Sequence, residues 1–234
     1  MANVVITGGS KGIGKSVAEI FVRNGHNVAV CARNGATLER LKSHLESINS
    51  NVSIDVHTCD VSVRDDIDSF YEEVMAGLGH VDVLVNNAGV YFPGRIIDEA
   101  NGAYEDMMKT NVDSAYHMSR AFCNSLMQSD KGHIFNICSV ASLQAYPNSG
   151  TYTISKYALL GLSKSLREEL KEYGIKVTSI IPGATYTDSW AGSDISESRF
   201  MKSSDISKMI FEIYNLSSQT VVEDIVLRPM LGDI

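Results

Sequence analysis

The stretch "NVVITGGSKGIGKSVAEIFVRNG" (residues 3–25) decides the fold of this chain. Residues 3–7 form a short run that is typical of a buried strand. The glycine-rich segment "TGGSKGIG" (7–14) follows at once, and a helical pattern then runs over residues 12–24. Asn24 and Gly25 form a favourable helix C-cap pair. The stretch therefore predicts a strand that passes through a glycine loop into a helix.

Short apolar runs alternate with longer helical patterns along the rest of the chain. Strands are expected within residues 27–32, 52–61, 81–89, 132–140, 175–183 and 221–229, and helices near 35–49, 63–77, 101–128 and 152–173. Uniformly apolar strands that alternate with helices indicate a parallel sheet covered on both faces. We predict a single α/β domain over residues 1–234, of the doubly wound Rossmann type with about seven strands. Residues 184–203 have no strong period and are expected to form a lid over the carboxyl ends of the strands.

Composition and charge exclude several classes of protein. The net charge of −8 argues against a nucleic-acid partner, which needs a basic face. No apolar run reaches the roughly 18 residues that a membrane span requires, and the first residues lack the features of a signal peptide. We therefore expect a cytoplasmic protein whose four scattered cysteines are reduced. The six histidines show no metal-ligand spacing, so we expect no metal.

The glycine loop indicates dinucleotide binding. Its GxxxGxG spacing differs from the commoner GxGxxG, but the physical logic is the same. Glycine lets the backbone approach a pyrophosphate closely, and the N-terminus of the following helix offers unpaired N–H groups. The loop residues expected to contact the cofactor are Gly8, Ser10, Lys11, Gly12, Ile13 and Gly14.

The end of the second strand favours one dinucleotide over the other. NAD enzymes often have a carboxylate there, but this chain has Arg33 and Asn34, which we assign to the cofactor site. Arg33 and Lys11 suit a ribose 2′-phosphate, because guanidinium binds phosphate bidentately. The alternative is a solvated arginine at a strand end. We predict NADP(H) as the cofactor.

The segment "YTISK" (152–156) places a phenol and an ammonium four residues apart on a predicted helix. Residues at that spacing are neighbours on one face. A cation beside a phenol favours the phenolate and lowers a pKa that normally lies near ~10. Taken alone, this common pairing favours an ordinary surface pair over a catalytic one.

The order of the motifs gives the chain a family resemblance. It resembles the classical short-chain dehydrogenases/reductases over nearly its whole length. The motifs that carry the resemblance are "TGGSKGIG" (7–14), "NNAG" (86–89), Asn111 in "KTNVDSAY", Ser139 in "NICSVAS", "YTISK" (152–156) and "PGATYT" (182–187). The resemblance implies further cofactor contacts from Asp60, Val61, Asn87, Ala88, Gly89, Pro182, Gly183, Thr185 and Thr187.

The resemblance also implies catalytic roles. Tyr152 is expected to protonate the carbonyl oxygen of the substrate, and Lys156 to lower the pKa of Tyr152 and hold the nicotinamide ribose. Ser139 is expected to hydrogen-bond the substrate oxygen, and Asn111 to position a water that connects Lys156 to solvent. Ser139 follows the fifth strand and Tyr152 opens the next helix, so both are expected at the carboxyl edge of the sheet.

The substrate pocket is expected to be lined by Tyr91, Leu143, Tyr146 and Trp190, although each could equally pack within the lid or in an oligomer. An aromatic cleft suits a ring or a flat dicarbonyl. The end of the chain, "TVVEDIVLRPMLGDI", lacks the usual "DGG" and is similar to the bacterial sepiapterin-reductase-like branch. We therefore predict an NADPH-dependent reductase of a small-molecule carbonyl substrate.

Two other functions remain open at this point. A 3-oxoacyl-[acyl-carrier-protein] reductase needs a basic docking patch, to which Arg199 and Lys202 could contribute, although the net charge of −8 disfavours it. A non-catalytic NADP-binding sensor would usually lack part of the catalytic set, which is complete here. The resemblance implies a homodimer or homotetramer that pairs through the helices near 101–128 and 152–173.

Overall fold

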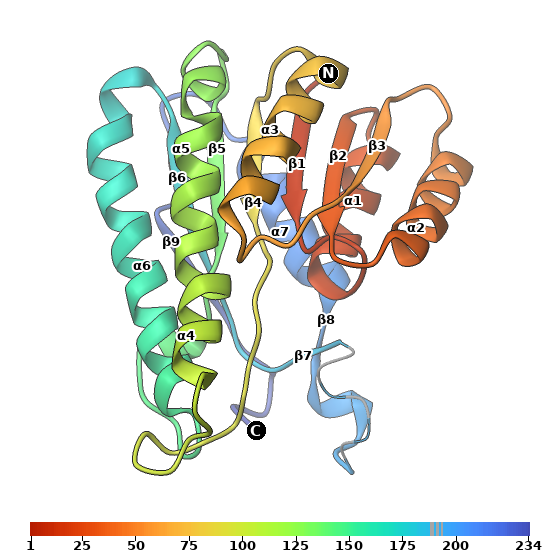
Figure 1. Cartoon of the computed structure of the whole chain (residues 1–234). Helices are drawn as coiled ribbons and strands as arrows, with labels where there is room; N and C mark the ends of the chain where they lie inside the picture. Colours follow the sequence, from red (N-terminus) through yellow and green to blue (C-terminus); the bar gives the residue numbers. More distant parts are fainter. Residues whose placement is uncertain (188–189, 191, 193) are drawn as a thin grey trace.

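The computed structural model describes residues 1–187, 190, 192 and 194–234. Its main sheet has seven strands in the order β3-β2-β1-β4-β5-β6-β9, and all neighbours are parallel (Figure 1). The strands are β1 (Asn3–Thr7), β2 (Asn27–Ala32), β3 (Ile54–Thr58), β4 (Val83–Asn86), β5 (His133–Ile137), β6 (Lys176–Pro182) and β9 (Asp224–Leu227). This arrangement confirms the predicted doubly wound sheet.

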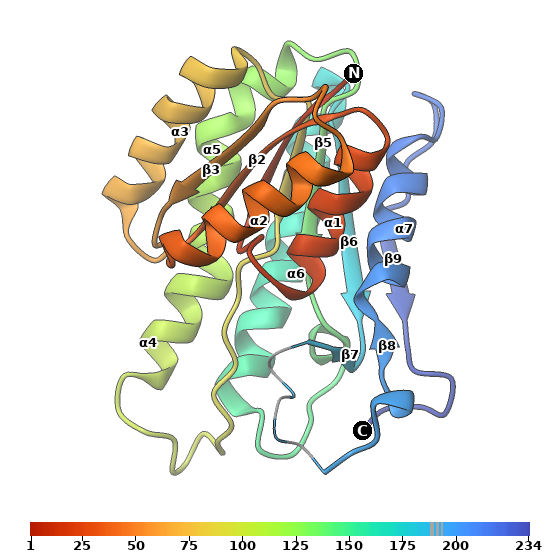
Figure 2. The same cartoon turned by 90° about the vertical axis from the view of Figure 1, so that its right-hand side faces the viewer.

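Helices cover both faces of the sheet (Figures 1 and 2). One face carries α1 (Gly12–Arg23), α2 (Gly35–Ile48) and α7 (Ser203–Tyr214), whose apolar side chains share one core with the strands. The other face carries α3 (Arg64–Leu78), α5 (Ser114–Met127) and α6 (Gly150–Leu170), which contribute to a second core. In the described part of the chain, every helix is too short or too polar to cross a membrane.

Helix α7 was not predicted from the sequence. Its buried residues Ile206, Ile210 and Ile213 recur every three or four positions, which is the spacing of one helix face. The preceding segment is also less irregular than expected, because β7 (Thr185–Tyr186) pairs in parallel with β8 (Met201–Lys202). The predicted lid, residues 184–203, is described only in part, since residues 188, 189, 191 and 193 lie outside the described residues.

The long helix predicted over residues 101–128 is interrupted. It consists of α4 (Ala103–Met108), a π-helical turn (Lys109–Asp113) and α5. Single π-turns within α-helices are frequently found at functional sites. The residues that the structure describes also include short 3₁₀ turns at Val140–Ser142, Lys171–Tyr173 and Glu197–Arg199.

The strand order reverses between β1 and β4, and this switch point sets the position of the site. Chain connections leave these two strands in opposite directions, so a crevice opens beyond their carboxyl ends. The C-terminus and the β7–β8 pair lie at this same end of the sheet (Figure 1). The loops that follow β1, β4, β5 and β6 therefore surround one region.

Candidate active site

The glycine loop and the loop after β4 meet at backbone distance. Gly8 has φ +63°, and a Cβ added there would lie 2.8 Å from the Ala88 Cα. A Cβ on Gly14 would lie 2.5 Å from the Asn87 Nδ2. Asn87 Nδ2 also donates to the carbonyls of Thr7 at 2.9 Å and Gly8 at 3.0 Å. The glycines thus form a cradle at the switch point that larger side chains would fill.

Helix α1 presents its N-terminus to this cradle. The helix has no side-chain cap and no acidic residue in its first turn. Its first N–H groups and the positive end of its dipole therefore suit an anionic ligand. Around it, Lys11 is exposed, Ser10 is half-buried, and the Ile13 side chain packs against the first core.

The ends of β2 and β3 form the other half of the cradle. The Asp60 carboxylate accepts hydrogen bonds from the Ser62 amide at 3.0 Å and from its hydroxyl at 2.7 Å. Burial raises the pKa of Asp60, but the Ser62 hydrogen bonds and the charge of Arg33 outweigh it and hold that pKa below its usual range. Arg33 is exposed, Val61 is buried, and the Asn34 side chain caps α2 by accepting from the Thr37 amide at 2.9 Å.

The turn after β6 packs against the glycine loop and so borders the cradle on a further side. A Cβ on Gly12, which has φ +56°, would lie 3.1 Å from the Thr187 Cγ2. Thr185 is buried and donates from Oγ1 to the Gly183 carbonyl at 3.0 Å. A Cβ on Gly183 would lie 3.1 Å from the Pro229 Cδ in the C-terminal tail. The segment Pro182–Thr187 thus lies between the glycine loop and the tail.

Tyr152 and Lys156 lie one turn apart near the start of α6. The Lys156 ammonium is 5.8 Å from the centre of the Tyr152 ring, and only 5% of Lys156 is exposed. Its Nζ donates to the Ile137 carbonyl at 2.9 Å. Because a buried cation is costly unless it is hydrogen-bonded, this carbonyl fixes the ammonium at the end of β5.

Asn111 ties three segments together from the π-turn. Its Oδ1 accepts from the Val90 amide at 2.7 Å, and its Nδ2 donates to the Val90 carbonyl at 2.9 Å and to Ser155 Oγ at 3.0 Å. A Cβ on Gly89 would lie 3.3 Å from the Asn111 Oδ1 and 3.7 Å from the Lys156 Nζ. The loop after β4, the π-turn and α6 therefore converge on one point.

Ser139 lies at the end of β5, where it caps a 3₁₀ turn that packs against α6. Its Oγ accepts from the Ala141 amide at 3.1 Å, and the residue is 9% exposed. A serine hydroxyl that accepts one hydrogen bond can still donate another. The hydroxyl thus remains available as a donor at the carboxyl edge of the sheet.

The four predicted pocket residues take different positions. The Tyr91 ring packs edge-on against the Tyr152 ring, with centroids 4.9 Å apart. Leu143 is exposed, whereas Trp190 packs against Phe200 with ring centroids 4.9 Å apart. Tyr91 is therefore the one of the four with a ring contact to Tyr152 among the described residues.

Tyr146 is held by residues that the sequence analysis did not single out. Its hydroxyl donates to the Asp233 carboxylate and accepts from Arg228 at 3.3 Å. Arg228 also forms an ion pair with Asp233. These residues belong to the C-terminal tail, more than 80 positions from Tyr146. No local pattern signals such a contact.

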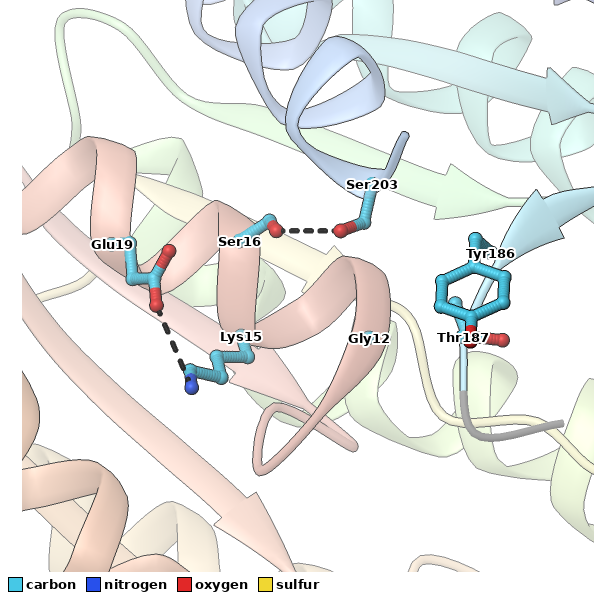
Figure 3. Close-up of a pocket in the computed structure, with 7 residues that line it drawn as sticks. All are labelled: Gly12, Lys15, Ser16, Glu19, Tyr186, Thr187 and Ser203. Carbon is cyan, nitrogen blue, oxygen red and sulfur yellow. Dashed lines mark hydrogen bonds and ion pairs between the residues drawn. The ribbon is translucent and has the colours of Figure 1, made fainter. Parts of the chain in front are cut away.

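A cavity of about 340 Å³ opens beside the glycine loop, between α1, β7 and α7 (Figure 3). Lys15 forms an ion pair with Glu19 at 3.8 Å, and Ser16 and Ser203 share a hydrogen bond of 2.9 Å. The lining consists of Gly12, Lys15, Ser16, Glu19, Tyr186, Thr187 and Ser203. The cavity adjoins the phosphate loop but contains none of the predicted catalytic side chains.

Comparison with known proteins agrees with this geometry. The chain is 32% identical to a sepiapterin reductase of Chlorobaculum tepidum, over 99% of this chain and 97% of that one. It is 29% identical to an uncharacterized oxidoreductase of Staphylococcus epidermidis, over 97% of this chain and 96% of that one.

Solved structures extend the comparison to the fold. An alcohol dehydrogenase from the archaeon Thermococcus sibiricus, complexed with 5-hydroxy-NADP, superposes with a TM-score of 0.92 at 26% identity, covering 100% of this chain and 99% of that one. A metagenomic short-chain oxidoreductase in complex with NADP gives a TM-score of 0.85 at 29% identity, covering 99% and 98%. The family described as "short chain dehydrogenase" matches residues 2–197. The chain therefore belongs to the short-chain dehydrogenase family.

Proposed function

We propose that this protein is an NADPH-dependent carbonyl reductase that acts on a small ketone, with a sepiapterin-like compound or a small dicarbonyl as the favoured substrate. One observation carries the proposal: the buried Lys156 ammonium lies beside the Tyr152 ring and, together with Asn111, borders Gly89 next to the glycine cradle. The structures in complex with NADP or 5-hydroxy-NADP support this cofactor.

The cradle fits a dinucleotide in two respects. Gly8 and Gly14 leave no room for side chains, and the N-terminus of α1 is uncapped. Residues of the glycine loop would hold the pyrophosphate, and Asp60 and Val61 would border the adenine. Arg33 and Lys11 would hold the 2′-phosphate, and Pro182–Thr187 would hold the nicotinamide end. The bound cofactor supplies a hydride to the carbonyl carbon of the substrate.

The side chains of this protein supply the proton and the orientation. Tyr152 donates the proton from its Oη to the carbonyl oxygen, which Ser139 Oγ orients by a hydrogen bond. Lys156 holds its positive charge beside Tyr152 and stabilises the phenolate that remains. General acid catalysis of this kind is worth about 10²–10⁴-fold in rate.

In this mechanism, Asn111 chiefly positions other groups and does not itself transfer a proton. Val90 and Ser155 use the donor hydrogens of its side chain. A water that connects Lys156 to solvent would therefore be held by an acceptor of Asn111, either its main-chain carbonyl or the second lone pair of Oδ1.

Two features bear on the substrate. The sepiapterin reductase at 32% identity and the Tyr91 ring beside Tyr152 both favour a flat, ring-like carbonyl compound. The alternative, a 3-oxoacyl-[acyl-carrier-protein] reductase, would rely on Arg199 and Lys202 as docking cations. Arg199 is partly buried, which leaves Lys202 as the more accessible of the two.

A paired assembly is also part of the proposal. Tyr104, Tyr116, Ile154 and Tyr157 expose apolar surface on α4, α5 and α6, the helices expected to form a homodimer or homotetramer interface. Light scattering of the purified protein tests this, and a monomer at micromolar concentration would exclude it.

Tyr152→Phe tests the function directly. NADPH consumption is followed with sepiapterin, a vicinal diketone, an acetoacetyl thioester and an aromatic aldehyde, and with NADH as the control cofactor. We expect the variant to bind NADPH with the affinity of the parent and to lose at least about 10²-fold in kcat. Turnover at the parent's rate would refute the role of Tyr152, and preference for the thioester would favour the carrier-protein reductase.

A further inference from the structure

The N-terminus of the helix that carries Tyr152 is completed by a distant loop. We call residues 87–102 the β4–α4 loop. Glu99 of this loop accepts from the Thr151 amide at 2.8 Å through Oε1, and from the Thr151 hydroxyl through Oε2. Thr151 immediately precedes Tyr152. Glu99 therefore satisfies a helix N–H that has no partner within α6.

The capping position of α6 does not supply this bond. Ser149 occupies the N-cap position, but its side chain makes no capping hydrogen bond. The β4–α4 loop instead makes two further backbone bonds, one to the residue before the N-cap and one to the first residue of the helix. The Gly94 amide donates to the Asn148 carbonyl at 2.9 Å, and the Gly150 amide donates to the Gly94 carbonyl at 3.0 Å. The start of α6 is therefore bound to the loop by main-chain and side-chain bonds.

Two glycines show how tightly these segments are packed. A Cβ on Gly94 would lie 2.6 Å from the Glu99 Cγ. A Cβ on Gly150 would lie 2.6 Å from the Ile96 Cγ1 and 3.0 Å from the Glu99 Oε1. Asn148, next to this contact, has φ 55°, and no other non-glycine residue in the described chain has a positive φ. The chain therefore takes a left-handed backbone conformation at the contact, and asparagine is among the residues that adopt it most readily.

The same loop also touches Tyr152 itself. Tyr91 packs its ring edge-on against the Tyr152 ring, and its hydroxyl donates to the Asn148 carbonyl at 3.2 Å. The loop therefore contacts the helix start at Thr151 and the phenol ring of the next residue. We propose that Glu99 is a positioning residue, whose carboxylate oxygens fix the first turn of α6 and so the place of the Tyr152 hydroxyl. This inference rests on the proposed function, in which Tyr152 is the proton donor.

The size of the effect follows from the geometry that proton transfer needs. A displacement of about 1 Å in a reacting group can cost about 10²-fold in rate. Loss of the cap frees the first turn of α6 while leaving the glycine cradle in place. We therefore expect kcat to fall and cofactor affinity to persist.

The test compares Glu99→Ala with Glu99→Gln and with Asp98→Ala in the NADPH-bound protein. Gln keeps an oxygen that can accept from the Thr151 amide. Asp98 is the matched control, because it is the neighbouring acidic residue and its carboxylate pairs with Arg95 on the exposed side of the loop. Steady-state kinetics give kcat and KM, and amide hydrogen exchange follows residues 150–156.

In Glu99→Ala we expect kcat to fall about ten- to a hundredfold, with KM and NADPH affinity within about threefold of the parent. Exchange of the Thr151 and Tyr152 amides should be about tenfold faster. Glu99→Gln and Asp98→Ala should stay within about threefold of the parent in every measurement. If Glu99→Gln behaves like the parent, the defect of Glu99→Ala comes from the lost hydrogen-bond acceptor and not from the lost charge.

Parent-like kcat and exchange in Glu99→Ala would overturn the inference. A loss of the same size in Glu99→Gln or in Asp98→Ala would do so as well. Tyr152→Phe, measured alongside, separates the two hypotheses. If that variant loses turnover while Glu99→Ala retains it, the positioning role falls and the proposed function survives. If Tyr152→Phe retains turnover, the proposed function falls, and Tyr152 has no proton transfer for Glu99 to position.

Discussion

Replacing Asn111 with Leu removes hydrogen bonds from the centre of the site with little change in side-chain volume. Asn111 is 1% exposed and makes hydrogen bonds of 2.7, 2.9 and 3.0 Å to Val90 and Ser155. Each such bond contributes about 1 kcal/mol net, so the three together contribute about 3 kcal/mol. The cost rises to about 5 kcal/mol if the Val90 amide and carbonyl are left buried without partners.

Thermal unfolding measures this cost. For a chain of this length, about 1 kcal/mol lowers Tm by about 2–4 °C, so Asn111→Leu should lower Tm by at least about 6 °C. Asn124→Leu is the matched control, since Asn124 is exposed on α5, and its Tm should change by less than about 2 °C. NADPH consumption should also fall, because the Asn111 bonds hold the loop that faces Lys156. A Tm within 2 °C of the parent, together with parent kcat, would refute this account of the π-turn.

Two further predictions concern the cofactor and pH. Arg33→Asp should shift the ratio of kcat/KM from NADPH toward NADH by at least about tenfold, because a carboxylate repels the 2′-phosphate and accepts from the ribose hydroxyls; an unchanged ratio would count against the 2′-phosphate assignment. Burial, aided by the charge of Lys176, lowers the pKa of His133 from 6.5 to about 3. Below pH 6.5 the unfolded chain therefore binds a proton that the native state does not. The free energy of unfolding should fall by about 1.4 kcal/mol per pH unit between about pH 6 and pH 3 from this group, in addition to other titrations. Urea unfolding should show that the free energy of unfolding of His133→Gln depends less steeply on pH over that range than that of the parent. An equal pH dependence in the two proteins would contradict the lowered pKa of His133.

The fold could be predicted from the sequence because its signals are local. Each strand is a short apolar run, and the glycine loop directly follows the first of them, so neither needs knowledge of distant contacts. Helix α7 was not predicted, although Ile206, Ile210 and Ile213 recur at helical spacing. The π-turn at Lys109–Asp113 leaves no comparable trace, since one extra residue per turn does not alter which residues are apolar.

The candidate site could be predicted from the sequence only in part. Tyr152 and Lys156 lie within one helical turn, so their spacing alone brings them together. Glu99 meets Thr151 across 52 positions, and Tyr146 meets Asp233 across 87. Such contacts depend on how loops cross the carboxyl edge of the sheet, which no sequence period records. The roles of the site residues remain predictions for the variants described above.

The π-turn also determines which changes in chain length the site can accept. In an α-helix each residue advances the side chains by about 100°, so an insertion or deletion rotates everything beyond it. Lys109–Asp113 contains the additional residue of the π-turn, and Asn111 within it borders Gly89 together with Lys156. Deleting one residue there would restore a regular helix and turn Asn111 away from Val90. In this segment, the number of residues is therefore as strict a requirement as the identity of any one of them.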